Sequence, residues 1–426
     1  MTEEFNLRSR KYWQRLGWGL LVGLLSTIGA FIFIAIMDWG LSLVWPDPPS
    51  WEPFSGSWTI VIIMTAVGLL VGVIHQFTDA AEMEVFEAID NGRLDPKPVP
   101  ASLLASMVSL IGGFSLGPEV PTGMLAAGLG TWLSERRQLD ESTSRTNVLS
   151  GVASAYSGLF SSPFAMVLMI LESTHMQTTM YYGTLFIVGL AAAIGFSLFF
   201  WGGGNTFSAL WGLVQPEQYD LQIWHVGVGI LFGMIALPVV IFFMLSVKIL
   251  KRFVAPLNKQ PILRGVMGGL LLGLLGKALP LTLFLGTEGL SITTSQAAEI
   301  GVGLLFLFAF AKLLALSGAL SFGFIGGPIF PLFFVGATLG SAINLLFPQI
   351  PMSLAVSCMM AAVPAAMVPM PLALVVIVAL VVGLSPMNTM PVVLASLTSF
   401  AIAHGFGVIE GSPKKAVAKT AVSGQR

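Results

Sequence analysis

Charged residues are scarce in this sequence, and their scarcity excludes an ordinary soluble domain. Asp, Glu, Lys and Arg together make up 10% of the 426 residues, against about 25% in soluble domains. Apolar side chains instead make up 55% of the chain. The net charge is −1 and no basic block is long, so a nucleic-acid partner is excluded as well. The composition predicts an all-α polytopic membrane protein whose surroundings are the lipid bilayer.

Cysteine is almost absent, since Cys358 is the only one in the chain. A single cysteine rules out an intramolecular disulfide, and its apolar surroundings indicate a small buried side chain. Histidine is also scarce: the four histidines are far apart and share no metal-ligand spacing. The sequence therefore predicts neither a metal site nor a cofactor.

Long apolar runs are what the chain has in abundance. They lie near 16–45, 58–77, 101–133, 146–171, 183–201, 222–250, 262–279, 300–318, 328–347, 353–383 and 389–406. The run 101–133 is interrupted at Gly117, and the run 353–383 by three prolines, so each is expected to form two shorter helices. We expect one transmembrane domain over 16–410, between a cytoplasmic N-terminal segment (1–15) and a disordered cytoplasmic tail (411–426).

Basic loops alternate along the chain with loops that lack Lys and Arg. Both termini and the loops near 93–97, 136–145 and 248–264 are basic, whereas the loops 46–57 and 202–221 contain neither residue. Because Lys and Arg accumulate in cytoplasmic loops, both termini are predicted to be cytoplasmic, in a multi-pass protein of the cell (inner) membrane. Lys277 and Lys312 fall outside the basic set. Lys312 is expected to contact an acid or a helix end, or to attract anions.

The chain repeats itself when it is shifted by 210 residues. Gly117-Pro118-Glu119-Val120-Pro121 then lies over Gly327-Pro328-Ile329-Phe330-Pro331, and Pro163 lies close to the register of Pro371. The first half starts at the basic N-terminus, but the second starts after a loop without Lys or Arg. The pattern predicts two inverted repeats, about 16–201 and 222–406, with a transport site at the matching breaks.

Glu119 is an acid inside an apolar run, where burying charge is costly. An ionised Asp at a bilayer centre costs roughly 2.5 to 3.5 kcal/mol on insertion scales. Half-helices that begin after Gly117 and Gly327 would present free N–H groups and about +0.5 charge at each N-terminus. Two such ends form an anion site. An ionised Glu119 would occupy that site and a protonated one would leave it, which predicts a pH-dependent gate.

Three stretches of this sequence resemble the CLC family of chloride channels and proton/chloride antiporters. They are GGFSLGPEVP (112–121), FSSPFAMVLMILE (160–172) and GFIGGPIFPLFFVGATLG (323–340). The resemblance covers most of the chain and is greatest to a short bacterial branch of ion-transport proteins. It implies an inverted-repeat fold of tilted, partly broken helices, and a homodimer with one pore in each subunit.

The resemblance also implies which residues serve the anion. Glu119 matches the gating glutamate of the family's first signature, and Gly327, Ile329 and Pro331 match its Gly-x-Phe-x-Pro pattern. The family's Gly-Ser-Gly-Ile-Pro signature is missing, and Thr78 is the candidate substitute for its serine. The expected anion-binding residues are Gly117, Val120, Gly327, Ile329, Phe330 and Thr78.

Several departures leave the coupling mechanism open. Pro118 and Pro328 each remove an N–H donor beside the expected site. The position of the family's inner, proton-carrying glutamate is Ser173 here; the adjacent Glu172 is the candidate for the proton path, although it points about 100° away on a helix. No tyrosine follows Tyr219 to match the family's C-terminal tyrosine. Both channel-like and proton-coupled flux therefore remain.

The sequence predicts transmembrane transport of chloride or another halide, gated by Glu119, and no enzymatic activity. An intramembrane enzyme with Glu119 as base would need a nucleophile, metal ligands or a basic lipid-phosphate pocket, and none is visible. A carrier coupled to cations would present half-helix carbonyl ends and more intramembrane acids. These two alternatives stay open at this point.

Overall fold

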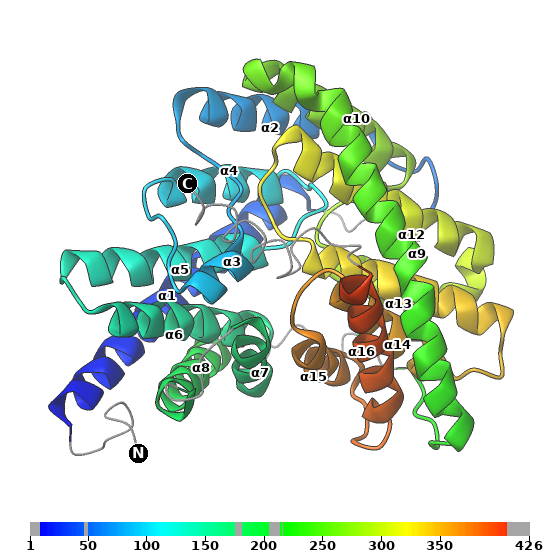
Figure 1. Ribbon diagram of the computed structural model, residues 1–426. Coiled ribbons are helices and arrows are strands. Elements are labelled where there is room, and N and C mark those ends of the chain that lie inside the picture. Colours follow the sequence, from blue (N-terminus) through cyan, green and yellow to red (C-terminus); the bar gives the residue numbers. More distant parts are fainter. Residues whose placement is uncertain (1–8, 47–49, 175–180, 204–213, 215, 407–426) are drawn as a thin grey trace, which may run out of the picture.

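The chain is built almost entirely of helices. The computed structural model describes residues 9–46, 50–174, 181–203, 214 and 216–406, and this part contains sixteen α-helices and no strand beyond one isolated bridge (Figure 1). Seven of the helices are long and apolar enough to cross a membrane. The all-α membrane fold is therefore confirmed. The predicted tail (411–426) and most of the segment 1–15 lie outside the described residues.

The helices of the described residues fall into two runs of eight. The first run is α1 (Arg10–Val44), α2 (Trp58–Phe77), α3 (Val85–Asn91), α4 (Val99–Ile111), α5 (Glu119–Arg136), α6 (Glu141–Leu159), α7 (Pro163–Ser173) and α8 (Tyr181–Gly203). The second is α9 (Ile223–Val254), α10 (Pro261–Ala278), α11 (Thr287–Ser295), α12 (Ala297–Phe322), α13 (Ile329–Leu346), α14 (Met352–Ala365), α15 (Pro371–Val382) and α16 (Thr389–Gly405), with the short 3-10 turns η3 (Ala255–Lys259) and η4 (Pro280–Thr282). Each run begins with a long helix and has an 18-residue helix in fifth place.

The two runs lie side by side and meet through matching members. In Figure 1 the blue-to-green helices α1–α8 occupy one side and the green-to-red helices α9–α16 the other, with α2 packed on α10 and α7 on α15. The second and seventh helix of one run thus contact the second and seventh of the other. The assignment of two inverted repeats stays a prediction, which these pairings favour.

The broken helices follow from glycine and proline in the sequence. The run 101–133 divides into α4 and α5, and the run 353–383 divides into α14 and α15, as predicted. The run 146–171 also divides, into α6 and α7. The break lies before Pro163, because proline fits the first turn of a helix but not its interior. Ser162 caps the new helix by accepting a hydrogen bond from the Ala165 N–H (3.1 Å).

Candidate functional site

Two helix N-termini meet at one point between the two runs. Gly117 and Gly327 form an isolated antiparallel bridge, in which the N–H of Gly117 donates to the Gly327 carbonyl (2.8 Å) and the reverse bond is 2.7 Å. Helix α5 begins at Glu119 and helix α13 at Ile329, just after the bridge. The positive ends of both helix dipoles therefore lie close together inside the protein.

The carboxyl group of Glu119 lies at the start of α13. Its side chain is 1% exposed, and Oε1 accepts a hydrogen bond from the N–H of Ile329 (2.6 Å). The Phe330 N–H faces the same carboxyl group. Oε2 is buried and has no hydrogen-bond partner in the described part of the chain. A carboxylate at a helix N-terminus takes the position that a free anion would take there.

Glycine at both ends of the bridge leaves room for the carboxyl group, which lies where a side chain would be. A Cβ on Gly117 or on Gly327 would overlap carboxyl atoms of Glu119. Neither glycine has a positive φ, so the requirement is one of space rather than of backbone conformation. The two loops thus form a closed pocket for this acid.

The structure gathers five of the six expected anion-binding residues around Glu119, and it leaves one elsewhere. Gly117, Gly327, Ile329, Phe330 and Val120 all lie in the bridge or in the first turns of α5 and α13. The N–H groups of the two glycines are occupied by the bridge, so the free donors come from the helix turns. Thr78 lies at the exposed end of α2, where its hydroxyl donates to the Ile74 carbonyl (2.7 Å) and accepts from the Ala80 N–H (3.3 Å).

The loops that lead to the bridge are related by the same shift of 210 residues that relates Gly117 to Gly327. Gly113 and Gly323 both adopt positive φ values, 82° and 91°, which favour glycine. The next residues, Phe114 and Phe324, stack with their ring centroids 3.7 Å apart. The shift of 210 residues aligns these Gly-Phe pairs too, so this correspondence is present in the sequence.

Tyr156 was not predicted as part of the site. It is fully buried in α6, and its hydroxyl donates to the backbone carbonyl of Glu119 (2.6 Å). Tyr156 packs edge-on against Phe160, whose ring stacks on Phe330 in the first turn of α13 (5.5 Å). A tyrosine within an apolar run gives no sign of this role, because the contact depends on how α6 packs against α5.

Glu172 is used as a helix cap. Its two carboxylate oxygens accept hydrogen bonds from the N–H groups of Leu372 (2.8 Å) and Ala373 (3.0 Å) at the start of α15. The hydroxyl of the adjacent Ser173 donates to the Pro369 carbonyl (3.3 Å). Both residues therefore hold α7 against α15. A role for Glu172 in proton transfer stays a prediction.

Lys312 is a buried cation with backbone partners. Its ammonium donates to the carbonyl oxygens of Leu283 (2.6 Å) and Phe284 (2.8 Å), and at longer range to those of Leu281 (3.4 Å) and Thr282 (3.3 Å). In the described residues it forms no salt bridge with a carboxylate. These carbonyls belong to the turn η4 and to the two residues after it, so Lys312 contacts a helix end rather than an acid.

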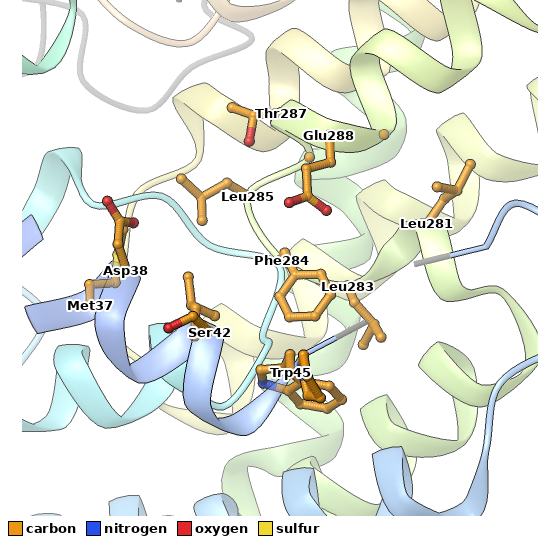
Figure 2. Close-up of a pocket in the computed structure, with 14 residues that line it drawn as sticks. Met37, Asp38, Ser42, Trp45, Leu281, Leu283, Phe284, Leu285, Thr287 and Glu288 are labelled. Carbon is orange, nitrogen blue, oxygen red and sulfur yellow. The ribbon is translucent and has the colours of Figure 1, made fainter. Parts of the chain in front are cut away.

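A cavity of about 420 Å³ lies beside the segment that Lys312 holds. Figure 2 shows Asp38, Ser42 and Trp45 along α1 on one side, and Phe284, Leu285 and Glu288 from the chain around α11 on the other. The Phe284 N–H donates to the Gly113 carbonyl (3.0 Å), so this wall touches the loop that leads to Glu119. The lining includes two acids and no Lys or Arg.

No group of three or more His, Cys, Asp and Glu side chains that could hold a metal occurs within the described ranges. What the site offers instead is a set of backbone N–H donors, two helix dipoles and one carboxylic acid. Such a group of donors can stabilise an anion after it loses its hydration shell, without a full positive charge that would trap it.

Known proteins share both the sequence pattern and the fold. Residues 67–404 match the family model described as "Voltage gated chloride channel". A protein of Escherichia coli O7:K1 (strain IAI39 / ExPEC), named "Putative ion-transport protein YfeO", is 28% identical over 358 residues, which cover 79% of this chain and 80% of that protein.

Two solved structures have the same fold. One is titled a slow cyanobacterial Cl⁻/H⁺ antiporter; it has a TM-score of 0.72, 18% identity, and coverage of 99% of this chain and 100% of that one. The other is titled a CLC-type fluoride/proton antiporter; it has a TM-score of 0.72, 22% identity, and coverage of 91% and 94%.

Proposed function

This chain belongs to the voltage gated chloride channel family, and from that premise we propose that it moves a small inorganic anion, such as chloride or another halide, across a membrane. Glu119 serves as the gate of this path. The relatives named above support transport, since one is named an ion-transport protein and two are titled antiporters of an anion and protons. Transport, rather than catalysis, is the activity that we assign.

The observation that carries this proposal is the position of the Glu119 carboxyl group. It accepts the Ile329 N–H at the start of α13, where the dipoles of two helices favour negative charge. An ionised carboxylate therefore competes with the permeating anion for the same donors, and a protonated one leaves them free. N-terminal helix ends attract anions, so they favour an anion over the cation of a coupled carrier.

We further propose that anion flux is channel-like, with weak or no coupling to protons. Coupling needs a path that delivers protons to Glu119 from the side opposite to its opening. Glu172 is the candidate for that path, but its two oxygens already accept the N–H groups of α15. Exchange with protons remains the competing mode, which the two titled antiporters favour.

The location and assembly of the protein are proposals as well. The protein lies in the cell (inner) membrane, with both termini in the cytoplasm, because the basic loops and both ends fall on one side of the predicted topology. We propose a homodimer with one complete site in each subunit. Glu119 and the donors around it all come from one chain, so each subunit can conduct alone.

Purified protein in liposomes tests the function directly. Chloride-loaded vesicles with valinomycin should release chloride, and a pH electrode in the same bath should record little proton movement. Absence of anion release under every halide gradient would refute transport. Proton uptake driven by a chloride gradient would refute the uncoupled mode but leave anion transport intact.

The gate is tested by Glu119→Gln. The amide cannot ionise, so flux should equal or exceed that of the wild type, severalfold at high pH, and should no longer change with pH. Glu52→Gln, at an exposed loop position, is the matched control and should keep the pH dependence of the wild type. A Glu119→Gln variant with an unchanged pH profile would contradict the assignment.

A further inference from the structure

The end of α6 touches the first turns of both helices that begin at the gate, α5 and α13. Tyr156 and the cap residue Phe160 are four positions apart, so they lie on one face of α6. The Tyr156 hydroxyl donates to the Glu119 carbonyl at the start of α5 (2.6 Å), and the Phe160 ring stacks on Phe330 at the start of α13. The rings of Tyr156 and Phe160 also pack edge-on, with centroids 5.6 Å apart. We call these two residues the α6 clamp.

The hydroxyl of Tyr156 reaches the backbone of the gate through a gap that a glycine leaves. Tyr156 is 1% exposed, and a Cβ on Gly123 of α5 would overlap its hydroxyl oxygen. The Glu119 carbonyl also receives the Thr122 hydroxyl (3.2 Å), so two hydroxyl groups converge on it. A buried tyrosine hydroxyl usually finds a hydrogen-bond partner. Here that partner is the peptide group next to the gating acid.

The tyrosine of the α6 clamp is not repeated in the second run of helices. The shift of 210 residues that aligns the gate motifs places Ala366 over Tyr156, and a shift of 208, which suits the next helix (α7), places Pro364 there. Neither side chain has a hydroxyl. The shift of 210 also places Ile329 over Glu119. The two halves thus differ both at the acid and at the tyrosine that holds its backbone, which indicates that the tyrosine serves the acid rather than the shared fold.

A fixed backbone at Glu119 favours the closed gate. A glutamate side chain has many rotamers, and few of them bring its carboxyl group to the Ile329 N–H. Binding of the ionised carboxylate to that donor orders the side chain and the turn from which it extends, whereas an open gate needs no such order. A turn that is already held in place lowers the cost of this ordering.

We propose that Tyr156 is a positioning residue of the gate: its hydroxyl holds the first turn of α5, and Phe160 holds the first turn of α13, so that the ionised carboxylate meets its donors. This role rests on the proposed function, and it adds a residue that sets the pH at which the gate closes. Tyr156 is the titratable side chain that faces Glu119 from α6, whereas the first turn of α13 presents backbone N–H groups and apolar side chains. Without the hydroxyl, the gate closes at a higher pH.

Chloride efflux from liposomes over a series of pH values tests Tyr156→Phe. Loss of one buried hydrogen bond should move the midpoint of the pH profile upward by about 0.5 to 1 unit. Above the wild-type midpoint, flux should then exceed that of the wild type about three- to tenfold. A profile that coincides with that of the wild type would refute the positioning role, even if the variant melts at a lower temperature.

Tyr219→Phe is the matched control. The Tyr219 hydroxyl also donates to a backbone carbonyl, that of Asn388 (3.4 Å), but this contact lies before α9 and before α16 rather than at the gate. The control loses the same chemical group and should keep the wild-type midpoint. An equal shift in Tyr219→Phe would show that the effect is not specific to the gate, and would count against Tyr156.

Phe160→Leu tests the other arm of the α6 clamp. It removes the ring that stacks on Phe330 and should also move the midpoint to higher pH. The double variant Tyr156→Phe/Phe160→Leu should shift no further than the larger of the two single shifts, because the clamp needs both contacts. Shifts that add up would reveal two independent contacts and overturn the clamp.

Infrared spectra distinguish failure of the clamp from failure of the proposed function. The C=O band of the protonated Glu119 carboxyl group is identified by its loss in Glu119→Gln, and its disappearance with rising pH gives the midpoint without any flux. If the wild type conducts anions and neither single variant moves the midpoint, Tyr156 is not a positioning residue, and the proposed function stands. If the wild type conducts no anion, the proposed function has failed, and the infrared midpoint still decides whether Tyr156 holds the carboxyl group in place.

Discussion

At the scale of single residues, the site depends on the lack of a side chain at two glycines as much as on the side chain of Glu119. The Glu119 carboxyl group fills the space beside Gly117 and Gly327, and one N–H holds it there. This group is the end of a flexible side chain, so it can move without any change in the backbone. A gate of this kind needs only a rotation about side-chain bonds.

Gly327→Ala should displace the gate. The added methyl group would overlap the Glu119 carboxyl group, which can swing away at little cost, and the backbone at Gly327 accepts an L residue. We expect anion flux several-fold above wild type at high pH, where the ionised carboxylate otherwise closes the path. The flux is measured as chloride efflux from liposomes over a series of pH values. Gly303→Ala, with open space at its Cβ, is the control. Chloride efflux that is slower in Gly327→Ala than in the wild type would refute displacement of the gate.

Lys312→Met should destabilise the protein. The change leaves the carbonyls of Leu283 and Phe284 without their buried donor, at about 1 to 3 kcal/mol each. Lys277→Met is the matched control, because Lys277 lies over the Trp58 ring (4.7 Å), a contact of about 0.5 to 1 kcal/mol. Thermal melting in detergent should show a clearly larger loss for Lys312→Met; equal melting temperatures would count against the carbonyl cluster as a stabilising contact.

The sequence pointed to Glu119 and to the two motifs around it but not to Tyr156, and the reason is physical. Glu119 is visible because an acid in an apolar run between glycine and prolines is costly and unusual. Tyr156 carries no such signal, since it lies in an apolar run and its role depends on how α6 packs against α5.

At the scale of elements, the breaks were easier to predict than the shortest helices. Proline and glycine mark the ends of α4 and α14, and α5 and α13 begin where the repeated motif predicts. Helices α3 and α11 were missed. Helix α3 carries Glu87 and Asp90, and α11 is rich in serine and threonine, so neither forms an apolar run. Tertiary packing, rather than local preference, stabilises them.

The contact between α7 and α15 permits a test of Glu172. Glu172→Ala removes the acceptor for two N–H groups of α15 and should cost about 1 kcal/mol, measured as a lower melting temperature. The pH dependence of anion flux should stay unchanged, because the carboxylate serves as a cap. Ser173→Ala, which removes one weak hydrogen bond, is the milder control. A shifted pH profile in Glu172→Ala would instead support a proton path.

At the scale of the whole molecule, two similar halves surround one site. The second and seventh helices of the two runs pair with each other, and the Gly-Phe pairs and the bridge obey one shift of 210 residues. The assignment of two inverted repeats stays a prediction, which rests on the repeat that appears when the chain is shifted along itself. The cavity beside α1 was not predictable, because its acids, Asp38 and Glu288, come from distant segments that meet only in the folded protein.

The predicted topology is tested by cysteine labelling. Cys358 is fully buried, so Cys358→Ser gives a background without reactive thiols. In that background, Ser50→Cys should react with an impermeant maleimide added to intact cells, whereas Lys259→Cys should react only after the membrane is opened. Both positions are exposed. The opposite pattern would invert the orientation and place both termini outside.

The bridge between Gly117 and Gly327 has a mechanical consequence. Two hydrogen bonds join the halves at the gate, so the helices cannot separate there without breaking them. A gate that opens by side-chain rotation leaves the cross-sectional area of the protein in the membrane unchanged. Lateral tension does work only on a change in area, so stretching the bilayer, or altering its thickness, should leave the opening of this pathway unaffected.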